Sequence, residues 1–196
     1  MAKARPGATA SGKAVAGPVY QLKVTLDGIR PPIWRRLLVP GPVTLTDLHD
    51  ILQAAMGWRD CHMHAFEVAG LTYGTGGPYA LDDALDEDNF RLDQVAPPEK
   101  GKFRYEYDFG DGWRHTILVE KVLAPDPTAQ YPSCTKGKRR CPPEDCGGVW
   151  GYAELLAALD HPRTAEHREL IGGVGGKFDP EAFDLDAINA RLRRFG

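Results

Sequence analysis

The chain has 196 residues, 42% of them hydrophobic, and carries a formal net charge of −3 at pH 7. The apolar content excludes a disordered protein, and the length suits one domain. No apolar run approaches the ~20 residues that cross a bilayer, so no membrane contact is expected. The slight negative charge argues against a protein that coats nucleic acid by charge alone.

The first 18 residues are predicted to form a disordered tail ahead of one domain that spans residues 19–196. The tail contains Lys3, Arg5 and Lys13 but no apolar stretch of the kind that a signal peptide needs. Without a signal peptide, we expect a cytoplasmic protein whose four cysteines stay reduced. Reduced thiols favour metal ligation or packing over disulfides.

Two strands are predicted to open the domain. Residues 19–26 alternate apolar and polar side chains, which is typical of a half-buried strand. Gly28 and the Pro31-Pro32 pair make a turn, and residues 33–39 form the returning strand. The pattern therefore indicates a β-hairpin.

A helix is predicted next. Apolar residues recur at helical spacing between residues 45 and 55, Thr44 or Thr46 can cap the start, and Gly57 ends the run. His49 falls at the edge of the apolar face. We expect it to be partly exposed and to have a packing role rather than a ligand role.

The central region holds the strongest β pattern of the chain. It begins with a short strand at His64–Val68, a turn at Tyr73–Pro78 and an acidic loop with a short helical piece at 82–93. Residues 103–122 then place aromatic side chains at every second position before the tight turn at 110–112 and a returning strand. This pattern predicts a second hairpin.

The last third is predicted to be mostly helical. Residues 125–143 are rich in turn formers and expected to be irregular, and helices follow at 150–159, at 165–171 and after Asp184. Strands mostly precede helices, so the expected fold class is α+β. We expect an antiparallel sheet built from the N-terminal and central hairpins and packed by helices, with a cysteine-containing loop and C-terminal helices.

Three cysteines suggest a zinc site. Cys134, Cys141 and Cys146 lie in one loop at spacings of Cys-x6-Cys-x4-Cys. Thiolates are strong zinc ligands, and a tetrahedral structural site needs four donors. Candidates for the fourth donor are Cys61, His62, His64, His115 or a carboxylate. Alternatively, the thiols are small buried side chains that pack an irregular loop.

A second set of candidates surrounds the central hairpin. His62 and His64 would point to the same face of a strand, and the hairpin tip carries Asp108, Asp111 and His115. If the two strands pair, the five side chains could converge into a catalytic site that holds a metal or moves a proton. The alternatives are histidines that are either packed or exposed and aspartates that cap a turn.

Two charged segments are candidates for contact with partners. Lys136, Lys138, Arg139 and Arg140 form a basic run that could bind nucleic acid. The acidic stretch Asp82–Asp93 could contact another protein. Solvated faces of an ordinary protein are the alternative for both.

Several motifs together resemble a known family. They are Tyr105-Glu-Tyr-Asp-Phe-Gly-Asp-Gly-Trp-x-His115, Cys141-Pro-Pro-Glu-Asp-Cys-Gly-Gly148, Phe178-Asp-Pro-Glu-x-Phe183, Pro31-Pro-Ile-Trp-Arg35 and His62-x-His64. Over residues 19–195 the chain resembles the plasmid pRiA4b ORF-3-like family, also called the TnpR passenger family of insertion elements. The resemblance implies an α+β fold and a tie to plasmids or mobile elements. It implies no particular activity, and no serine-recombinase motif is evident.

Three functions follow as hypotheses. The first is a binding module, stabilised by a metal such as zinc, that is accessory to the nucleic-acid transactions of a mobile element. The second is a small metal-dependent hydrolase that acts on phosphoesters at His62, His64, Asp108, Asp111 and His115. The third is a protein-interaction domain that uses the acidic stretch.

Overall fold

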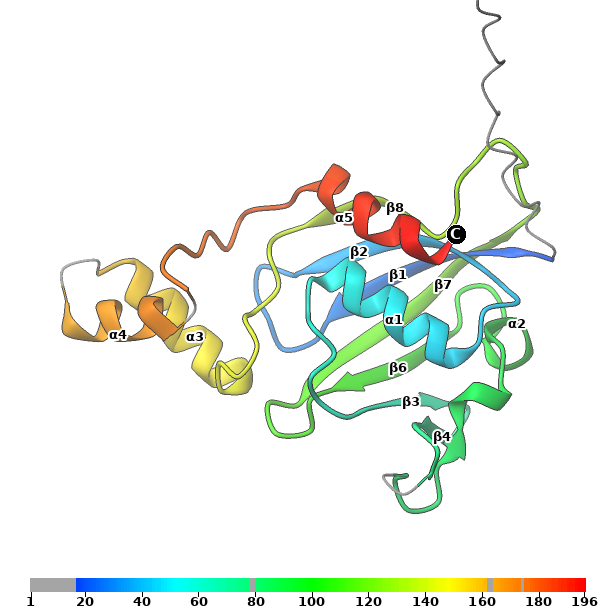
Figure 1. Cartoon of the computed structure of the whole chain (residues 1–196), viewed down its shortest axis with the longest axis horizontal. Coiled ribbons are helices and arrows are strands. Elements are labelled where there is room, and N and C mark those ends of the chain that lie inside the picture. The colour runs from blue at the N-terminus through cyan, green and yellow to red at the C-terminus, as the bar shows by residue number, and fades with distance from the viewer. Residues whose placement is uncertain (1–16, 78–79, 162–163, 174) are drawn as a thin grey trace, which may run out of the picture.

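The computed structural model describes residues 17–77, 80–161, 164–173 and 175–196 (Figure 1). The strands are β1 Val19–Leu26, β2 Trp34–Pro40, β3 His64–Val68, β4 Leu71–Gly74, β5 Leu85–Asp86, β6 Lys102–Tyr107, β7 Trp113–Leu123 and β8 Ser133–Lys138. The helices are α1 Leu45–Met56, α2 Leu92–Val95, α3 Gly148–Leu159, α4 Ala165–Gly173 and α5 Leu185–Leu192, with 3-10 helices at Glu87–Asn89 and Arg193–Phe195. Except for its last two residues, the predicted tail lies outside the described residues. None of the described helices has the length and apolarity needed to traverse a bilayer.

The strands form one sheet in the order β5-β4-β3-β6-β7-β1-β2-β8. Neighbouring strands run antiparallel, except that β4 and β5 pair parallel over a short stretch. The two predicted hairpins are present as β1–β2 and β6–β7. The predicted α+β fold, with its sheet, packing helices and C-terminal helices, is confirmed.

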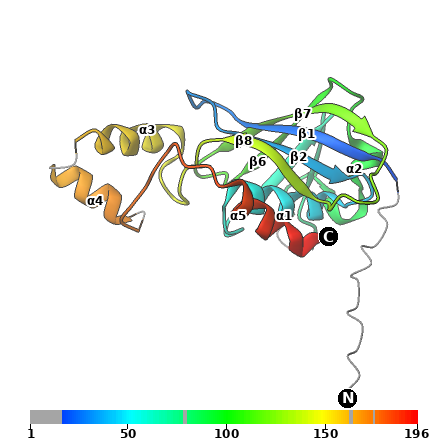
Figure 2. The same ribbon diagram turned by 90° about the horizontal axis from the view of Figure 1, so that it is seen from above.

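The helices α1 and α5 cover one face of the sheet and leave the other face bare (Figure 2). The alternation in the strands explains this arrangement. In β1, Leu22 and Val24 are buried, whereas Lys23 and Thr25 are half-exposed on the opposite face. The buried face packs against α1, where Ile51 is fully buried. The helices α3 and α4 lie beyond one end of the sheet (Figures 1 and 2).

The helix α1 begins and ends where its sequence signals predict. Thr44 Oγ1 accepts the Asp47 N–H at 3.1 Å, and the Asp47 carboxylate accepts the Thr44 N–H at 3.0 Å. This reciprocal pair satisfies backbone donors that the first helical turn leaves free. Gly57 then adopts a φ of 97°, a left-handed conformation that ends the helix. The helix thereby holds His49 against the sheet.

Two segments that the sequence predicts as loops contain strands. Leu71–Gly74 forms β4 where the sequence predicts a turn from residue 73, and Ser133–Lys138 forms β8 inside the region predicted to be irregular. Both are short and contain glycine and polar residues, so neither shows apolar alternation. The strand β8 is fixed by pairing with β2 and by Asn189 of α5, whose side chain bonds the Cys134 N–H and C=O at 2.8 and 3.0 Å.

Candidate functional site

A cleft of about 650 Å³ opens between the start of α1, the segment that leads into β3, and the loop that carries the 3-10 helix Glu87–Asn89. Its lining residues are Thr46, His49, Asp50, Asp60, Cys61, His62, Met63, His64, Thr75, Gly76, Glu87 and Asp88. Among the described residues, this lining has three histidines and four carboxylates but no lysine or arginine. Convergent titratable groups in a cleft identify it as the candidate site.

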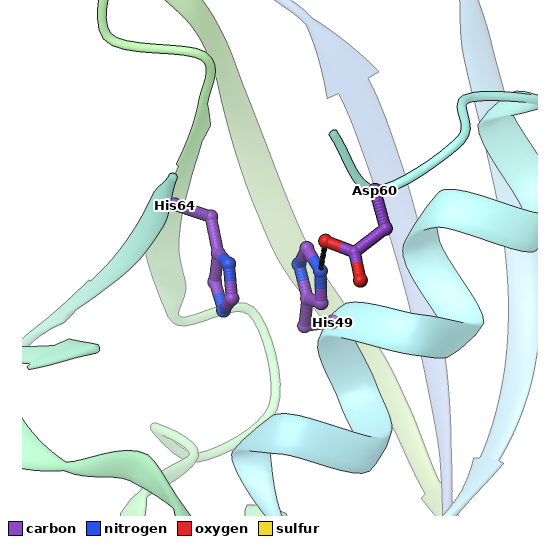
Figure 3. Close-up of side chains that lie close together, drawn as sticks. All are labelled: His49, Asp60 and His64. Atoms are coloured by element: carbon purple, nitrogen blue, oxygen red, sulfur yellow. Dashed lines mark hydrogen bonds and ion pairs between the residues drawn. The ribbon is translucent and has the colours of Figure 1, made fainter. Parts of the chain in front are cut away.

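Two histidines that line the cleft stack face to face. His49 comes from the buried face of α1, and His64 is the first residue of β3. Their ring centroids are 3.4 Å apart and their planes differ by 8°, with Asp60 beside the pair (Figure 3). Two imidazolium rings would repel each other at this separation, so the two rings are not both charged.

A closed circuit of hydrogen bonds fixes His49. Its Nε2 lies 2.8 Å from Asp60 Oδ1, and its Nδ1 lies 2.8 Å from the Tyr105 hydroxyl. Gln53 donates to that hydroxyl at 3.0 Å and accepts the Asp60 N–H at 2.9 Å. Burial, and next the neighbouring His64, lowers the pKa of His49 to about 4, so this ring is neutral at pH 7. Because a carboxylate only accepts, the proton of His49 lies on Nε2.

A buried carboxylate sets the tautomer of His64. Its Nε2 lies 3.0 and 2.9 Å from the two oxygens of Glu87, which is only 2% exposed. Thr75 donates to the same carboxylate at 3.3 Å. Nε2 of His64 therefore carries the proton, and Nδ1 presents a lone pair in the neutral ring. Across the described part of the chain, no hydrogen bond reaches that Nδ1.

His49, Asp60 and His64 each offer one ligand atom, and these three atoms lie within 4.8 Å of one another. The three side chains are therefore close enough to bind one metal ion. Two imidazoles and a carboxylate suit zinc and similar divalent transition metals. To act as a ligand through Nε2, His49 would release the proton that this nitrogen carries. The pairing of Glu87 with His64 is the contact that commonly orients a metal-ligating histidine.

His62 lines the same cleft but belongs to a second group. Its Nε2 lies 3.0 Å from Asp145 Oδ1 and 3.6 Å from Asp108 Oδ2, without hydrogen-bond alignment to either. Asp108 and Asp145 have φ values of 56° and 55°, in the left-handed region that aspartate adopts more readily than most residues. Asp108 Oδ1 also accepts the Gly110 N–H at 3.0 Å, so this aspartate holds the hairpin turn as well.

The five residues that the sequence suggests as catalytic candidates lie in different parts of the structure. His64 lies in the stacked pair, and His62 and Asp108 lie in the neighbouring group. Asp111 instead accepts a backbone N–H just before α3 at 3.2 Å. His115 is fully buried among aromatic rings and does not line the cleft. The five side chains therefore do not converge on one point.

The structure also separates the three cysteines. Among the described residues, three groups of His, Cys, Asp and Glu side chains are close enough together to hold a metal ion. None of these groups contains Cys134, Cys141 or Cys146. Cys134 is buried on β8, Cys141 contacts the Met56 sulfur at 3.8 Å, and Cys146 is half-buried ahead of α3. Burial raises the pKa of all three thiols, to about 12 for Cys146. These surroundings fit the alternative role, in which the thiols pack the loop.

The predicted basic run is divided between three environments. Lys136 and Lys138 are exposed on β8. Arg139 is only 6% exposed and binds Glu181 at 2.6 Å. The Arg140 guanidinium lies 4.9 Å from the centre of an aromatic ring. Of the four, Lys136 and Lys138 therefore share an exposed surface on β8, and Arg140 is exposed beyond the end of that strand.

Sequence reasoning missed His49, Asp60 and Glu87. The helical pattern predicts a partly exposed packing role for His49, but the side chain is 3% exposed and hydrogen-bonded at both nitrogens. Asp60 lies in an irregular link, and Glu87 lies in an acidic stretch that resembles a solvated loop. The one available signal was a titratable residue beside the apolar face of α1.

The fold and the cleft define the chain as an α+β protein with a histidine–carboxylate site beside an antiparallel sheet. The family model of the plasmid pRiA4b ORF-3-like proteins matches residues 18–187, and the chain belongs to this family, as its motifs suggest. The uncharacterized protein y4hQ of Sinorhizobium fredii (strain NBRC 101917 / NGR234) is 36% identical over 173 residues, 87% of this chain and 89% of that protein. The crystal structure of MM3350 from Methanosarcina mazei Go1, a protein described as of unknown function, is also similar. It is 40% identical, with a TM-score of 0.79, and the match covers 86% of this chain and 96% of that one.

Proposed function

We propose that this chain is a metal-dependent hydrolase whose ion is held by His49, Asp60 and His64. The observation that supports the proposal most is the His64–Glu87 pair. A nearly inaccessible carboxylate holds Nε2, and the free Nδ1 belongs to a ring that stacks on a second candidate ligand. Three protein ligands at an open cleft are typical of catalytic sites, where the remaining position is left for water.

A bound divalent ion would lower the pKa of a water molecule, so that this water can act as a nucleophile near neutral pH. The residues of the chain would orient the ligands. Glu87 holds His64 in one tautomer, and Tyr105 and Gln53 hold the ring of His49. The acidic lining also attracts a cation, because no described lysine or arginine offsets its carboxylates.

The same lining argues for an uncharged substrate. A phosphoester, the class suggested from the sequence, would enter a cleft with four carboxylates and no cationic side chain among its described lining residues. Like charges in a confined site repel, so an anion would depend on the metal ion alone for attraction. A neutral ester or amide meets no such penalty, and we assign this substrate class.

The test is hydrolysis by the full chain after chelator treatment and reloading with zinc, cobalt or manganese. We expect metal-dependent cleavage of p-nitrophenyl acetate and little cleavage of p-nitrophenyl phosphate. His64→Ala should lose more than the roughly 10–100-fold that removal of a ligand-supporting residue costs. The matched control is His161→Ala, at an exposed histidine that does not line the cleft. Activity that survives in His64→Ala or needs no metal would contradict the proposal.

A second candidate function comes from the bare face of the sheet. On β2, Arg36 pairs with Lys23 of β1 on one side and with Lys136 of β8 on the other. Two residues earlier on β2, Trp34 pairs with Lys138 of β8. Paired residues point to the same side, so these five side chains share the bare face. Lys23 and Arg36 lie 5.3 and 5.5 Å from the centre of the Trp34 ring. The three lysines form no ion pair with any described carboxylate.

We infer from this face a contact with single-stranded nucleic acid, with bases on Trp34 and phosphates on the lysines. It would suit a protein accessory to the nucleic-acid transactions of a plasmid or mobile element. Fluorescence anisotropy with labelled single strands at several salt concentrations is the test. Lys136→Ala/Lys138→Ala should lower the salt dependence by about two phosphate contacts, and Lys100→Ala/Lys177→Ala, at exposed lysines outside the strands, should not. Absence of binding even at low salt would remove this candidate.

A further inference from the structure

A second cavity, of about 610 Å³, is lined in part by Trp58 and Arg59, which directly precede Asp60 in the chain. Four arginines contribute to its lining: Arg35 of β2, Arg59 of the link after α1, Arg140 after β8 and Arg191 of α5. This is the reverse of the metal cleft, whose described lining has carboxylates and no cation. The two hollows adjoin at neighbouring residues of the chain, Arg59 and Asp60.

Arg35 is a buried charge without a carboxylate partner. It is only 3% exposed, and its guanidinium donates to four backbone carbonyls at 2.8–3.0 Å. Its remaining hydrogen bond is to the Cys141 sulfur at 3.5 Å. Carbonyls and a thiol satisfy the hydrogen-bond donors of Arg35 but do not neutralise its charge, so a positive field remains at the cavity wall.

The two carboxylates that line the cavity offset only part of the charge of the four arginines. Glu144 accepts the backbone N–H of Arg59 at 2.7 Å and the Tyr107 hydroxyl at 3.2 Å. Asp184 caps α5 by accepting a backbone N–H at 2.9 Å. Within the described residues, none of the four arginines forms an ion pair. The guanidinium groups therefore outnumber the carboxylates, and their charges are not compensated by pairing.

We propose that this cavity binds a small phosphate-bearing molecule. Its volume falls within the range of small-ligand sites. Guanidinium groups are the side chains best suited to bind phosphate oxygens, with paired, charge-assisted hydrogen bonds. The walls also include the rings of Trp58 and Phe183, and Phe183 lies 5.1 Å from the Arg35 guanidinium. An apolar part of the ligand would pack on these rings while its phosphate meets Arg59, Arg140 and Arg191.

The binding test uses the full chain after chelator treatment, so that phosphate cannot bind through a metal ion in the other cleft. Isothermal titration is performed with pyrophosphate, with AMP and with citrate. We expect pyrophosphate or AMP to bind more tightly than citrate. Arg59→Gln/Arg140→Gln should weaken that binding by at least about tenfold, because each lost arginine removes a charge-assisted contact. Neither side chain forms a hydrogen bond with any described residue, and the one packing contact that is lost is that of Arg140 with the Phe178 ring. Circular dichroism and thermal unfolding of the double variant check that the fold is retained.

The matched control is Arg104→Gln/Arg114→Gln. It removes the same charge from arginines that are paired with Glu67 and Glu106 on the sheet. Binding should be unchanged in this control. Failure of both phosphate probes to bind, a preference for citrate, or an equal loss in the two double variants would overturn the proposal.

Discussion

At the scale of single residues, the proposed metal site depends most on the carboxylate of Glu87. Its two oxygens hold one nitrogen of His64, and the hydrogen bond decides which nitrogen remains free for a metal. In Glu87→Gln, the amide has one acceptor oxygen and can also present an N–H to the ring, so the tautomer is no longer fixed. We expect zinc affinity to fall by roughly 10–100-fold, measured by competition with a chromophoric chelator.

The matched change for this prediction is Glu67→Gln, on the same strand β3. Glu67 is exposed and pairs with Arg104 at 3.6 Å, away from the cleft. Its loss should leave zinc affinity within the experimental error. Equal affinities of Glu87→Gln and the wild type would show that Glu87 does not orient a ligand.

His115 supports a prediction on pH and stability. Burial lowers its pKa from 6.5 to about 4, so the folded state keeps the ring neutral where the unfolded state protonates it. Between pH 6.5 and 4 the unfolded state therefore binds more protons, and the free energy of unfolding falls as the pH falls. This group alone contributes about 3 kcal/mol to that fall.

Denaturant unfolding of the wild type and His115→Leu across this pH range measures the contribution. The variant should show a shallower loss of stability on acidification, whatever its absolute stability. Other groups that titrate in the window, such as His49, are present in both proteins and cancel in the comparison. Parallel pH profiles of the two proteins would contradict the assignment.

At the scale of secondary-structure elements, α1 positions one of the proposed ligands, and its start depends on Thr44. Thr44→Ala removes the hydroxyl that accepts the Asp47 N–H, which should cost about 1 kcal/mol of unfolding free energy. Urea denaturation is the measurement. Thr128→Ala, in an exposed loop where the hydroxyl bonds only Asp126, should cost less than half as much. A similar cost at both positions would argue against the capping role.

The elements that the sequence predicts correctly have signals within their own residues. The hairpins β1–β2 and β6–β7 follow from alternation, and α1 and α5 follow from periodic apolar residues with a cap at Thr44 or Asp184. The strands β4 and β8 lack alternation and form because a neighbouring strand supplies their hydrogen bonds. Pairing of this kind depends on the tertiary structure, so a local pattern does not reveal it.

At the scale of the whole molecule, the cleft shows why a site is harder to predict than a fold. His49, Asp60, His64 and Glu87 come from a helix, a link, a strand and a loop, and only folding brings them together. Both histidines of the His62-x-His64 motif line this cleft. The cysteine spacing predicted a centre that the structure does not assemble, because Cys134 lies on the sheet and Cys141 packs against α1.

The molecule also separates charge across a short segment of chain. The cleft that Asp60 lines suits a cation, and the cavity that Arg59 lines suits an anion. Because Arg59 and Asp60 are consecutive residues, a movement of this link would affect both sites. The two proposed ligands can nevertheless be tested separately, since chelator treatment removes only one of them.

The metal site at His49, Asp60 and His64 is the central claim, and elemental analysis of protein reloaded with zinc and then dialysed tests it most directly. The proteins to compare are the wild type, His49→Ala/His64→Ala and Cys134→Ser/Cys141→Ser/Cys146→Ser. We predict about one zinc ion per chain in the wild type and in the serine variant, and none in the histidine variant. Zinc that is lost with the cysteines and kept without the two histidines would contradict the account.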